Sequence, residues 1–296
     1  MNLNAKYKDS VFSFLFSDPD LLRELYGALE DISLPPDVPI IINTLEGVLF
    51  MDLINDISFE IGGKLVVLIE HQSSINPNMP LRLLMYIARV YEKMMKDKKQ
   101  YSSKRILIPR PEFFVLYNGT APYPDEEKMW LSEAFENPET LGLSQKAEFA
   151  LDLEVRVINI NEGHNSAIAR RCKKLAEYSA FIAKVRYFER EKCNKEAGMK
   201  EAIKYCREND ILKEFLEENA TEVINMLLAE WNLEDAKEVW REEAREEGRE
   251  EGLEEGLEKG REEIAQNMLR KGFSFEQIAE LSGLDIERVR ELSNRI

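Results

Sequence analysis

Hydrophobic residues in the first half of the chain change from a helical spacing to an alternating one and back, which predicts an α/β protein. Apolar residues recur at helical spacing between Val11 and Leu25, and Asp18-Pro19 divides this segment into two helices. Asp18 is suited to cap the second helix. A proline-rich turn follows, and then an extended segment is predicted over residues 40–51.

The most hydrophobic run of the chain, KLVVLI over residues 64–69, predicts a central strand that is covered on both faces. A second strand-like run, ISFEI, precedes it over residues 57–61. Gly62-Gly63 joins the two runs and is typical of a tight two-residue hairpin. Such a turn pairs Lys64 with Ile61 and Leu68 with Ile57.

Further elements complete the predicted α/β sandwich. The segment 81–95 has the spacing of an amphipathic helix, and residues 112–117 and 151–158 have the patterns of two more strands. Nearly everything from Ser166 onward has a helical pattern. An α/β sheet flanked by helices and followed by an all-helical C-terminal region is therefore expected.

The segment from Arg241 to Gly260 is biased toward glutamate, with four glycines spaced four residues apart: Gly248, Gly252, Gly256 and Gly260. Each interior glycine costs a helix about 1 kcal/mol relative to alanine. Small residues at this spacing would also let a second helix approach closely. The segment is interpreted either as a self-associating helix or frayed linker, or as a simple charged spacer.

The last segment, residues 274–292, has the pattern of two helices joined at Gly283, with Ser274 and Asp285 as N-caps. The expected small core consists of Ile278, Leu281, Leu284, Val289 and Leu292. The spacing resembles a helix-turn-helix. Acidic residues alternate with arginines on the second helix, so a structural or protein-contacting hairpin stands beside the DNA-reading interpretation.

The net charge of −16 argues against a nucleic-acid partner until its distribution is considered. Residues 82–110 contain nine lysines and arginines but only two acidic residues, Glu92 and Asp97. This basic stretch is either a solvated helix end and loop or a surface for phosphate.

The cysteines and the hydropathy of the chain argue against a disulfide-rich, a zinc-binding and a membrane protein. The three cysteines, Cys172, Cys193 and Cys206, are widely spaced in helical sequence, which favours reduced, packed thiols over disulfides or a zinc site. No apolar run is long enough for a membrane span, and the first residues lack a secretion signal. A cytoplasmic protein without membrane contact is expected.

A polar cluster, Glu70-His71-Gln72, ends the predicted central strand. Side chains alternate along a strand, so Glu70 and Gln72 project together while His71 faces away. The hairpin also brings Asp56 within a residue or two of Glu70. Two close carboxylates repel unless a cation lies between them, and oxygen ligands of this kind suit Mg²⁺ or Mn²⁺.

Several stretches together resemble the recombination-promoting nuclease and putative transposase family, which is similar to the PD-(D/E)XK nuclease superfamily. They include KYKDSVFSFLF, NDISFEIGGKLVVLIEHQSS, NPNMPLRLLMYIARVYE, FFVLYNG, the strand ending in INEGHN, and the Gly- and Glu-rich tail. The resemblance implies a restriction-endonuclease-like mixed sheet flanked by helices. It also implies a metal-dependent DNA nuclease.

The resemblance places the metal-binding aspartate on Asp56 and the strand acid on Glu70, with the backbone carbonyl of His71 as a further ligand. Gln72 occupies the position where the superfamily has lysine, which removes a cation from the mechanism. Asp52 competes with Asp56 for the first acid. Asp9 matches an acidic position in the family's opening motif, although it also suits a helix start.

Candidate DNA contacts lie in the basic stretch, at Arg82, Arg89 and Lys93. Tyr86, one turn after Arg82, is either a contact or a core residue. Asn118, at the end of its strand, is either a site residue or a turn residue.

The predicted division of the chain has four parts: a PD-(D/E)XK nuclease-like domain over 1–165, a helical region over 166–240, a Glu/Gly-rich helical linker over 241–264 and a helix-turn-helix-like hairpin over 265–296. The first hypothesis is a Mg²⁺-dependent DNA endonuclease that supports recombination or mobile-element activity. The second is a catalytically weak or inactive descendant that binds DNA or oligomerises through the helical tail. No residue favours strand joining, as in transposition proper, over cleavage.

Overall fold

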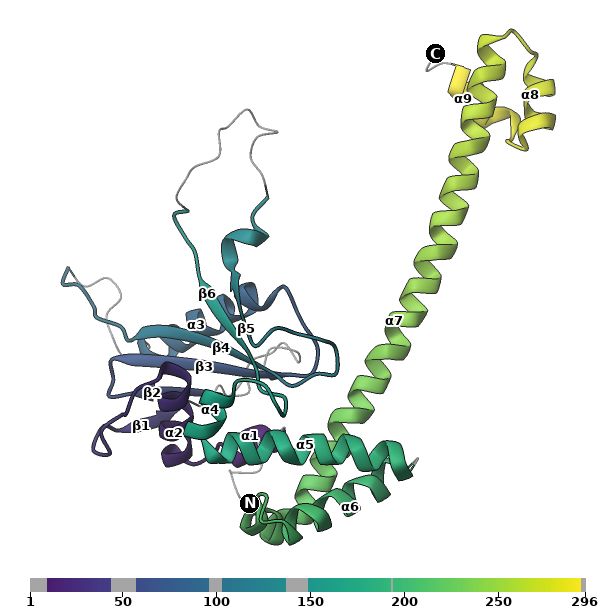
Figure 1. Cartoon of the computed structure of the whole chain (residues 1–296). Coiled ribbons are helices and arrows are strands. Elements are labelled where there is room, and N and C mark those ends of the chain that lie inside the picture. Colours follow the sequence, from purple (N-terminus) through teal and green to yellow (C-terminus); the bar gives the residue numbers. More distant parts are fainter. Residues whose placement is uncertain (1–9, 44–56, 96–102, 137–148, 193, 294–296) are drawn as a thin grey trace. The chain divides into compact units, whose positions relative to one another are not determined.

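The computed structural model describes residues 10–43, 57–95, 103–136, 149–192 and 194–293, and these form two compact units, Met1–Ala229 and Glu230–Ile296. The first unit contains a six-stranded mixed sheet with helices on both faces (Figure 1). The second unit is helical. The expected α/β class with an all-helical C-terminal region is confirmed, whereas the finer division at residues 165, 240 and 264 stays a prediction.

The described helices and strands follow one another along the chain in a mixed order that begins and ends with helices. They are α1 (Val11–Leu15), α2 (Pro19–Glu30), β1 (Ile40–Ile42), β2 (Ile57–Ile61), β3 (Leu65–Gln72), α3 (Met79–Met95), β4 (Arg110–Tyr117), β5 (Glu126–Trp130), η2 (Leu131–Ala134), β6 (Glu154–Asn159), α4 (Ser166–Arg171), α5 (Lys173–Lys192), α6 (Lys195–Glu208), α7 (Lys213–Arg270), α8 (Phe275–Ser282) and α9 (Ile286–Ser293). The strands lie in the order β1-β2-β3-β4-β6-β5.

The sheet combines a parallel centre with antiparallel edges. Strand β4 pairs in parallel with both β3 and β6, whereas β1–β2, β2–β3 and β5–β6 pair antiparallel. The carboxyl ends of β3, β4 and β6 therefore meet at one edge of the sheet, at Gln72, Tyr117 and Asn159. Crevices at such an edge are the usual place for ligands in open α/β sheets.

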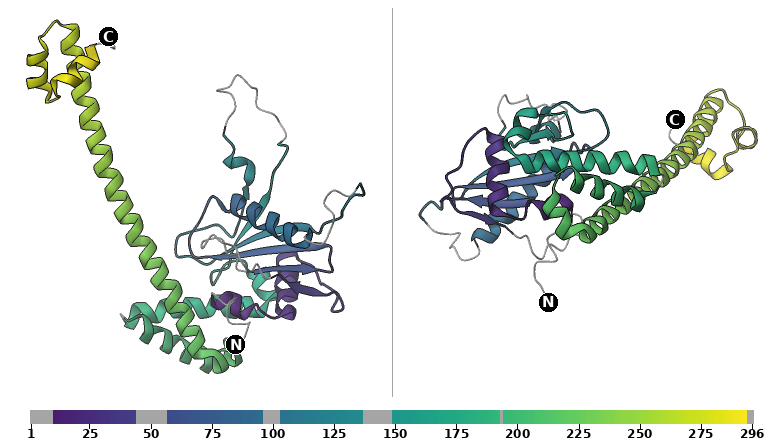
Figure 2. Two further views of the ribbon diagram at one scale, coloured as in Figure 1. Left: turned by 180° about the vertical axis from the view of Figure 1, so that it is seen from behind. Right: turned by 60° about the horizontal axis from the view of Figure 1, so that its bottom comes forward.

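Strand β3 is buried on both faces, as its uninterrupted apolar run predicts. Helix α3 covers one face, where Leu83 and Tyr86 pack against Val66 and Leu68. Helices α1, α2 and α5 lie on the other side (Figures 1 and 2). Each core side chain of this size contributes roughly 1.5–3 kcal/mol when it leaves water.

The hairpin register differs by one residue from the prediction. Ile57 pairs with Ile69 and Ile61 with Leu65, so the predicted partners Leu68 and Lys64 are wrong. The turn contains three residues instead of two, because Lys64 closes it by donating its N–H to the carbonyl of Ile61 (3.1 Å). Gly62 and Gly63 both have positive φ (58° and 64°), which fits the glycine pair but extends the loop.

Two further differences concern the edges of the sheet. Strand β5, with exposed glutamates and lysine, was not predicted because polar edge strands lack a strong alternating pattern. Within the described part of the predicted extended segment 40–51, only Ile40–Ile42 form a strand. The last predicted strand begins later than expected, at Glu154, and extends one residue further to Asn159.

The helical region contains the Glu- and Gly-rich segment within α7, which leaves helical geometry at Asn219 (φ −126°, ψ 20°). Added β-carbons at Gly248, Gly252, Gly256 and Gly260 would meet no atom within 4 Å. The glycine stripe therefore faces open space within the described part of its own unit.

The C-terminal hairpin forms as predicted, with Ser274 and Gln277 in a capping box and Gly283 left-handed at the end of α8. Its core contains Ala265, Ile278, Val289 and Leu292. The placement of Leu281 in that core is wrong, because its side chain is 67% exposed. Arg288 pairs with Glu262 and Glu291, so this arginine of the second helix is engaged within the bundle.

Candidate functional site

Glu70 is a buried acid at the carboxyl end of the central strand. Only 3% of the residue is exposed, and its Oε2 lies 3.6 Å from Nη2 of Arg82 on α3. Arg82 also donates a hydrogen bond to the Tyr86 hydroxyl (2.9 Å). A buried carboxylate requires a positive partner to stay charged, and the first turn of α3 supplies one.

Because side chains alternate along β3, the residues of the polar cluster 70–72 point to opposite faces of the sheet. Gln72 lies on the α3 side with Glu70, and its Nε2 donates to Sδ of Met79 (2.8 Å). His71 lies on the opposite face, stacked on Phe12 and within hydrogen-bonding distance of Tyr178 (Nε2 to hydroxyl, 3.2 Å). Its imidazole therefore faces away from Glu70.

The environment of His71 keeps its imidazole neutral. Burial, and next the positive charge of Arg186 on α5, lower the pKa of His71 to about 3. The neutral ring stacks on Phe12 and meets Tyr178 edge-on.

The remaining predicted acids, Asp9, Asp52 and Asp56, lie outside the described residues. Among the residues that are described, no group of three or more His, Cys, Asp or Glu side chains is arranged to hold a metal ion. Glu70 is thus the one predicted metal-binding carboxylate that the described ranges contain.

The predicted basic contacts lie along one face of α3. Arg82, Arg89 and Lys93 are spaced seven and four residues apart, so they follow the same side of the helix. Arg82 and Arg89 are partly buried and Lys93 is exposed. Tyr86, between them, is fully buried, which confirms its interpretation as a core residue.

A second polar cluster lies where β4 and β6 end, and sequence reasoning identified little of it. Asn118 and Asn159 are almost fully buried. Nη1 of Arg186 donates to Oδ1 of Asn118 (3.2 Å) and of Asn161 (3.0 Å), and Nη2 donates to the Asn118 carbonyl. Helix α5 is therefore tied to the carboxyl edge of the sheet.

The signal for this cluster was weak. Asn118 was considered, but its turn position offered a simpler interpretation. Arg186 stands in a helix rich in lysine and arginine, so no spacing distinguishes it from its neighbours. The sequence does contain an indication that this strand has a polar end. Asn159 and Asn161 follow directly on its apolar residues.

Gly119 lets β4 approach the end of β3 closely. A β-carbon at this position would lie 2.0 Å from the Ser73 carbonyl oxygen and 2.4 Å from the Tyr117 hydroxyl. We therefore expect Gly119→Ala to lower the free energy of unfolding by about 1–3 kcal/mol, because the backbone must shift. Urea denaturation followed by circular dichroism measures this loss. The matched change Gly252→Ala, in open space, should cause no loss, and equal stability of the two variants would contradict the close approach.

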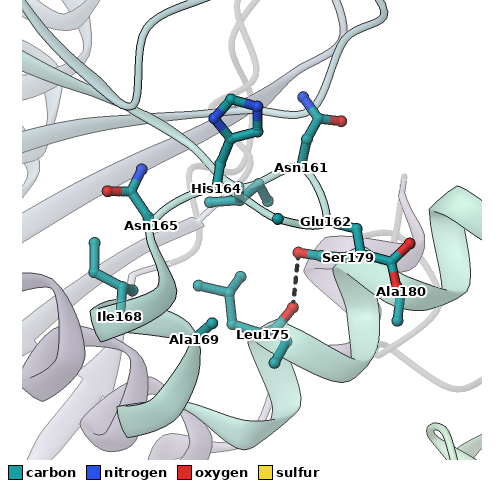
Figure 3. Close-up of a pocket in the computed structure, with 12 residues that line it drawn as sticks. Asn161, Glu162, His164, Asn165, Ile168, Ala169, Leu175, Ser179 and Ala180 are labelled. Carbon is teal, nitrogen blue, oxygen red and sulfur yellow. Dashed lines mark hydrogen bonds between the residues drawn. The ribbon is translucent and has the colours of Figure 1, made fainter.

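Two hollows adjoin this edge of the sheet. One, of about 250 Å³, lies under the loop 160–165 and is lined largely by aliphatic side chains of α4 and α5 (Figure 3). Ser179 in its wall donates to the Leu175 carbonyl (3.0 Å), and His164, which also lines the hollow, pairs with Asp125. The other is an open groove of about 570 Å³ between the turn at Gly119, the residues Asn161 and Glu162, and α5 from Ala183 to Glu191.

Part of the chain matches a known protein family. Residues 43–178 match the model of a family described as "Putative transposase, YhgA-like". No curated protein and no solved structure matches the chain. Within the described ranges, no helix combines the length and the apolar character needed to cross a membrane. The matched residues contain β2, β3, α3 and β4, and thus Glu70, Gln72 and Arg82.

Proposed function

Residues 43–178 of this chain match the YhgA-like putative transposase family, and on that basis we propose that the protein is a metal-dependent endonuclease that hydrolyses phosphodiester bonds in DNA. The family's description points to a function related to mobile elements. The observation that carries the proposal is Glu70, a buried acid beside Arg82 at the carboxyl end of β3. A buried charged pair is costly to keep for stability alone, so it favours a functional site.

Oxygen donors on this face suit Mg²⁺ or Mn²⁺. Glu70 supplies a carboxylate, and Gln72 on the same face has an amide oxygen. We assign the second carboxylate to Asp56, because it precedes Ile57, and Ile57 pairs with Ile69 next to Glu70. The backbone carbonyl of His71 completes the proposed ligand set, with Asp9 and Asp52 as accessory acids. When bound, the metal would polarise the phosphate and lower the pKa of a water molecule.

Arg82 can supply the positive charge that Gln72 lacks. Its Nη2 is 3.6 Å from Oε2 of Glu70, and 27% of the side chain is exposed, so Arg82 can contact both the acid and an approaching phosphate. The hydrogen bond to Tyr86 fixes the guanidinium from the core side. Arg89 and Lys93 extend the same face and would hold neighbouring phosphates without reading sequence.

A second function, a binding module without efficient catalysis, has its own support. The amide of Gln72 is engaged by Met79, and Glu70 is engaged by Arg82, so both side chains have partners within the fold. Such a descendant would bind DNA or other chains through the same surfaces. Cytoplasmic location is proposed for both functions.

A plasmid assay distinguishes the two functions. The purified full-length protein should convert supercoiled plasmid to the nicked form with Mg²⁺, and a chelator should prevent it. Metal titration followed by calorimetry gives the second readout, because a binding module without the metal site should show no Mg²⁺ or Mn²⁺ binding that depends on Glu70.

We also propose that the helical tail joins copies of the chain. Leu253, Leu257 and Ile264 on α7 are each more than half exposed, and their spacing of four and seven residues places them on one face. Replacing all three by serine should lower the oligomeric state measured by light scattering, because the apolar contact is lost. Leu281→Ser, another exposed leucine, should leave the state unchanged, and an unchanged mass in the triple variant would contradict the proposal.

A further inference from the structure

The open groove at the carboxyl edge of the sheet has the parts of a site for single-stranded nucleic acid. Arg186 forms part of its wall, and the hydrogen bonds to Asn118 and Asn161 fix its guanidinium. Arg190, one helical turn further along α5, is exposed in the same groove. Tyr187 lies between them with 55% of its surface exposed. The groove has a volume of about 570 Å³, which is that of a small-ligand site.

These side chains match the chemistry of a nucleotide whose base is not paired. Arginines bind phosphate oxygens with directed hydrogen bonds, and an exposed tyrosine ring offers a stacking surface to any base. A base inside a duplex is stacked on its neighbours and cannot use such a ring. The combination of a ring and flanking arginines therefore fits a single strand better than a double helix.

The charge of the groove supports the same choice. Glu162 and Glu191 line it together with the two arginines, so its formal charge is balanced. A balanced groove attracts a duplex weakly, because duplex binding depends mainly on neutralising closely spaced phosphates. Stacking and directed hydrogen bonds can still hold a single strand there.

The groove and Glu70 share one edge of the sheet. Gly119, in the groove wall, packs against the Ser73 carbonyl, and the Asn118 N–H donates to the Gln72 carbonyl (2.8 Å). Glu70 faces α3 and the groove lies on the α5 side, and both adjoin the carboxyl ends of β3 and β4. A strand that crosses these ends can therefore contact both the groove and Arg82, whose partly exposed side chain lies beside Glu70.

We propose that this groove binds a single-stranded segment of the nucleic acid, next to the scissile phosphate. The role beside a scissile bond rests on the proposed nuclease function, whereas the binding itself can be measured without cleavage.

The test uses the full-length Glu70→Gln protein and a fluorescent single-stranded oligonucleotide in buffer with a chelator. Tyr187→Ala and Arg190→Ala should each weaken binding about fivefold or more in fluorescence anisotropy. Tyr187→Phe should bind as the parent does, because it keeps the stacking ring. Lys173→Ala, a matched loss of charge at the other end of α5, should also bind as the parent does.

The salt dependence separates the two contacts. Arg190→Ala should reduce the slope of log affinity against log salt by about 0.7, the value for one phosphate contact on a single strand. Tyr187→Ala should leave the slope unchanged. Undiminished binding by both alanine variants, or a loss confined to duplex DNA, would overturn the groove proposal. Failure of the wild-type protein to nick plasmid would instead overturn the nuclease proposal and leave the binding result standing.

Discussion

Replacement of Glu70 by glutamine should abolish the Mg²⁺-dependent nicking of supercoiled plasmid, a loss of about 100-fold or more. Glutamine keeps the size of the side chain and removes the charge that attracts a hard cation. The same variant should lose Mg²⁺ binding in calorimetry. Because Glu70 is 3% exposed, a circular dichroism spectrum must show that the variant is folded.

A matched change on the neighbouring strand provides the control. Glu60→Gln on β2 removes an acid that pairs with Val66, four residues before Glu70 on β3. It leaves Glu70 intact, so this variant should nick as the wild type does. Nicking by Glu70→Gln at the wild-type rate would show that any activity resides elsewhere, and the assignment of this acid would be wrong.

Replacement of Arg82 by methionine should lower the free energy of unfolding by about 3 kcal/mol. Removing one member of a buried ion pair leaves the other charge without compensation, which typically costs about 3–5 kcal/mol. The lower end applies because Arg82 is 27% exposed and water can partly replace it. Urea denaturation at neutral pH measures the change.

The double variant Glu70→Gln/Arg82→Met should recover most of this loss, because neither charge is then left alone. Arg89→Met, on the same face of α3, should cost less than about 1 kcal/mol. If the double variant is as unstable as the sum of its single changes, Glu70 and Arg82 do not stabilise each other.

Strong patterns identified the centre of the fold but not its edges. The apolar run of β3 and the spacing of α3 allowed both elements to be predicted, because burial imposes the same pattern on any sequence. The register depended on whether Lys64 belongs to the strand or to the turn, and the local sequence allows both. Strand β5 is stabilised by its pairing with β6. Its own polar residues give no sign of that pairing.

The candidate site could be predicted only where its residues are close along the chain. Glu70 and Gln72 lie on one strand, so alternation placed them correctly on one face. The pairing of Arg82 with Glu70 was not predicted, because it depends on how α3 packs on the sheet. Arg186 reaches Asn118 across 68 positions, and no local rule connects such residues. Its place in the groove follows from the packing of α5 on the sheet.

The buried thiols of the first unit have a consequence for chemical resistance. Burial is the largest influence that raises the pKa of Cys172 to about 12 and of Cys206 to about 11. Peroxides and alkylating reagents attack the thiolate, and at neutral pH these two side chains are thiols shielded from water. The junction of α4 and α5 at Cys172 and helix α6 at Cys206 therefore keep their packing under oxidative conditions that modify exposed cysteines.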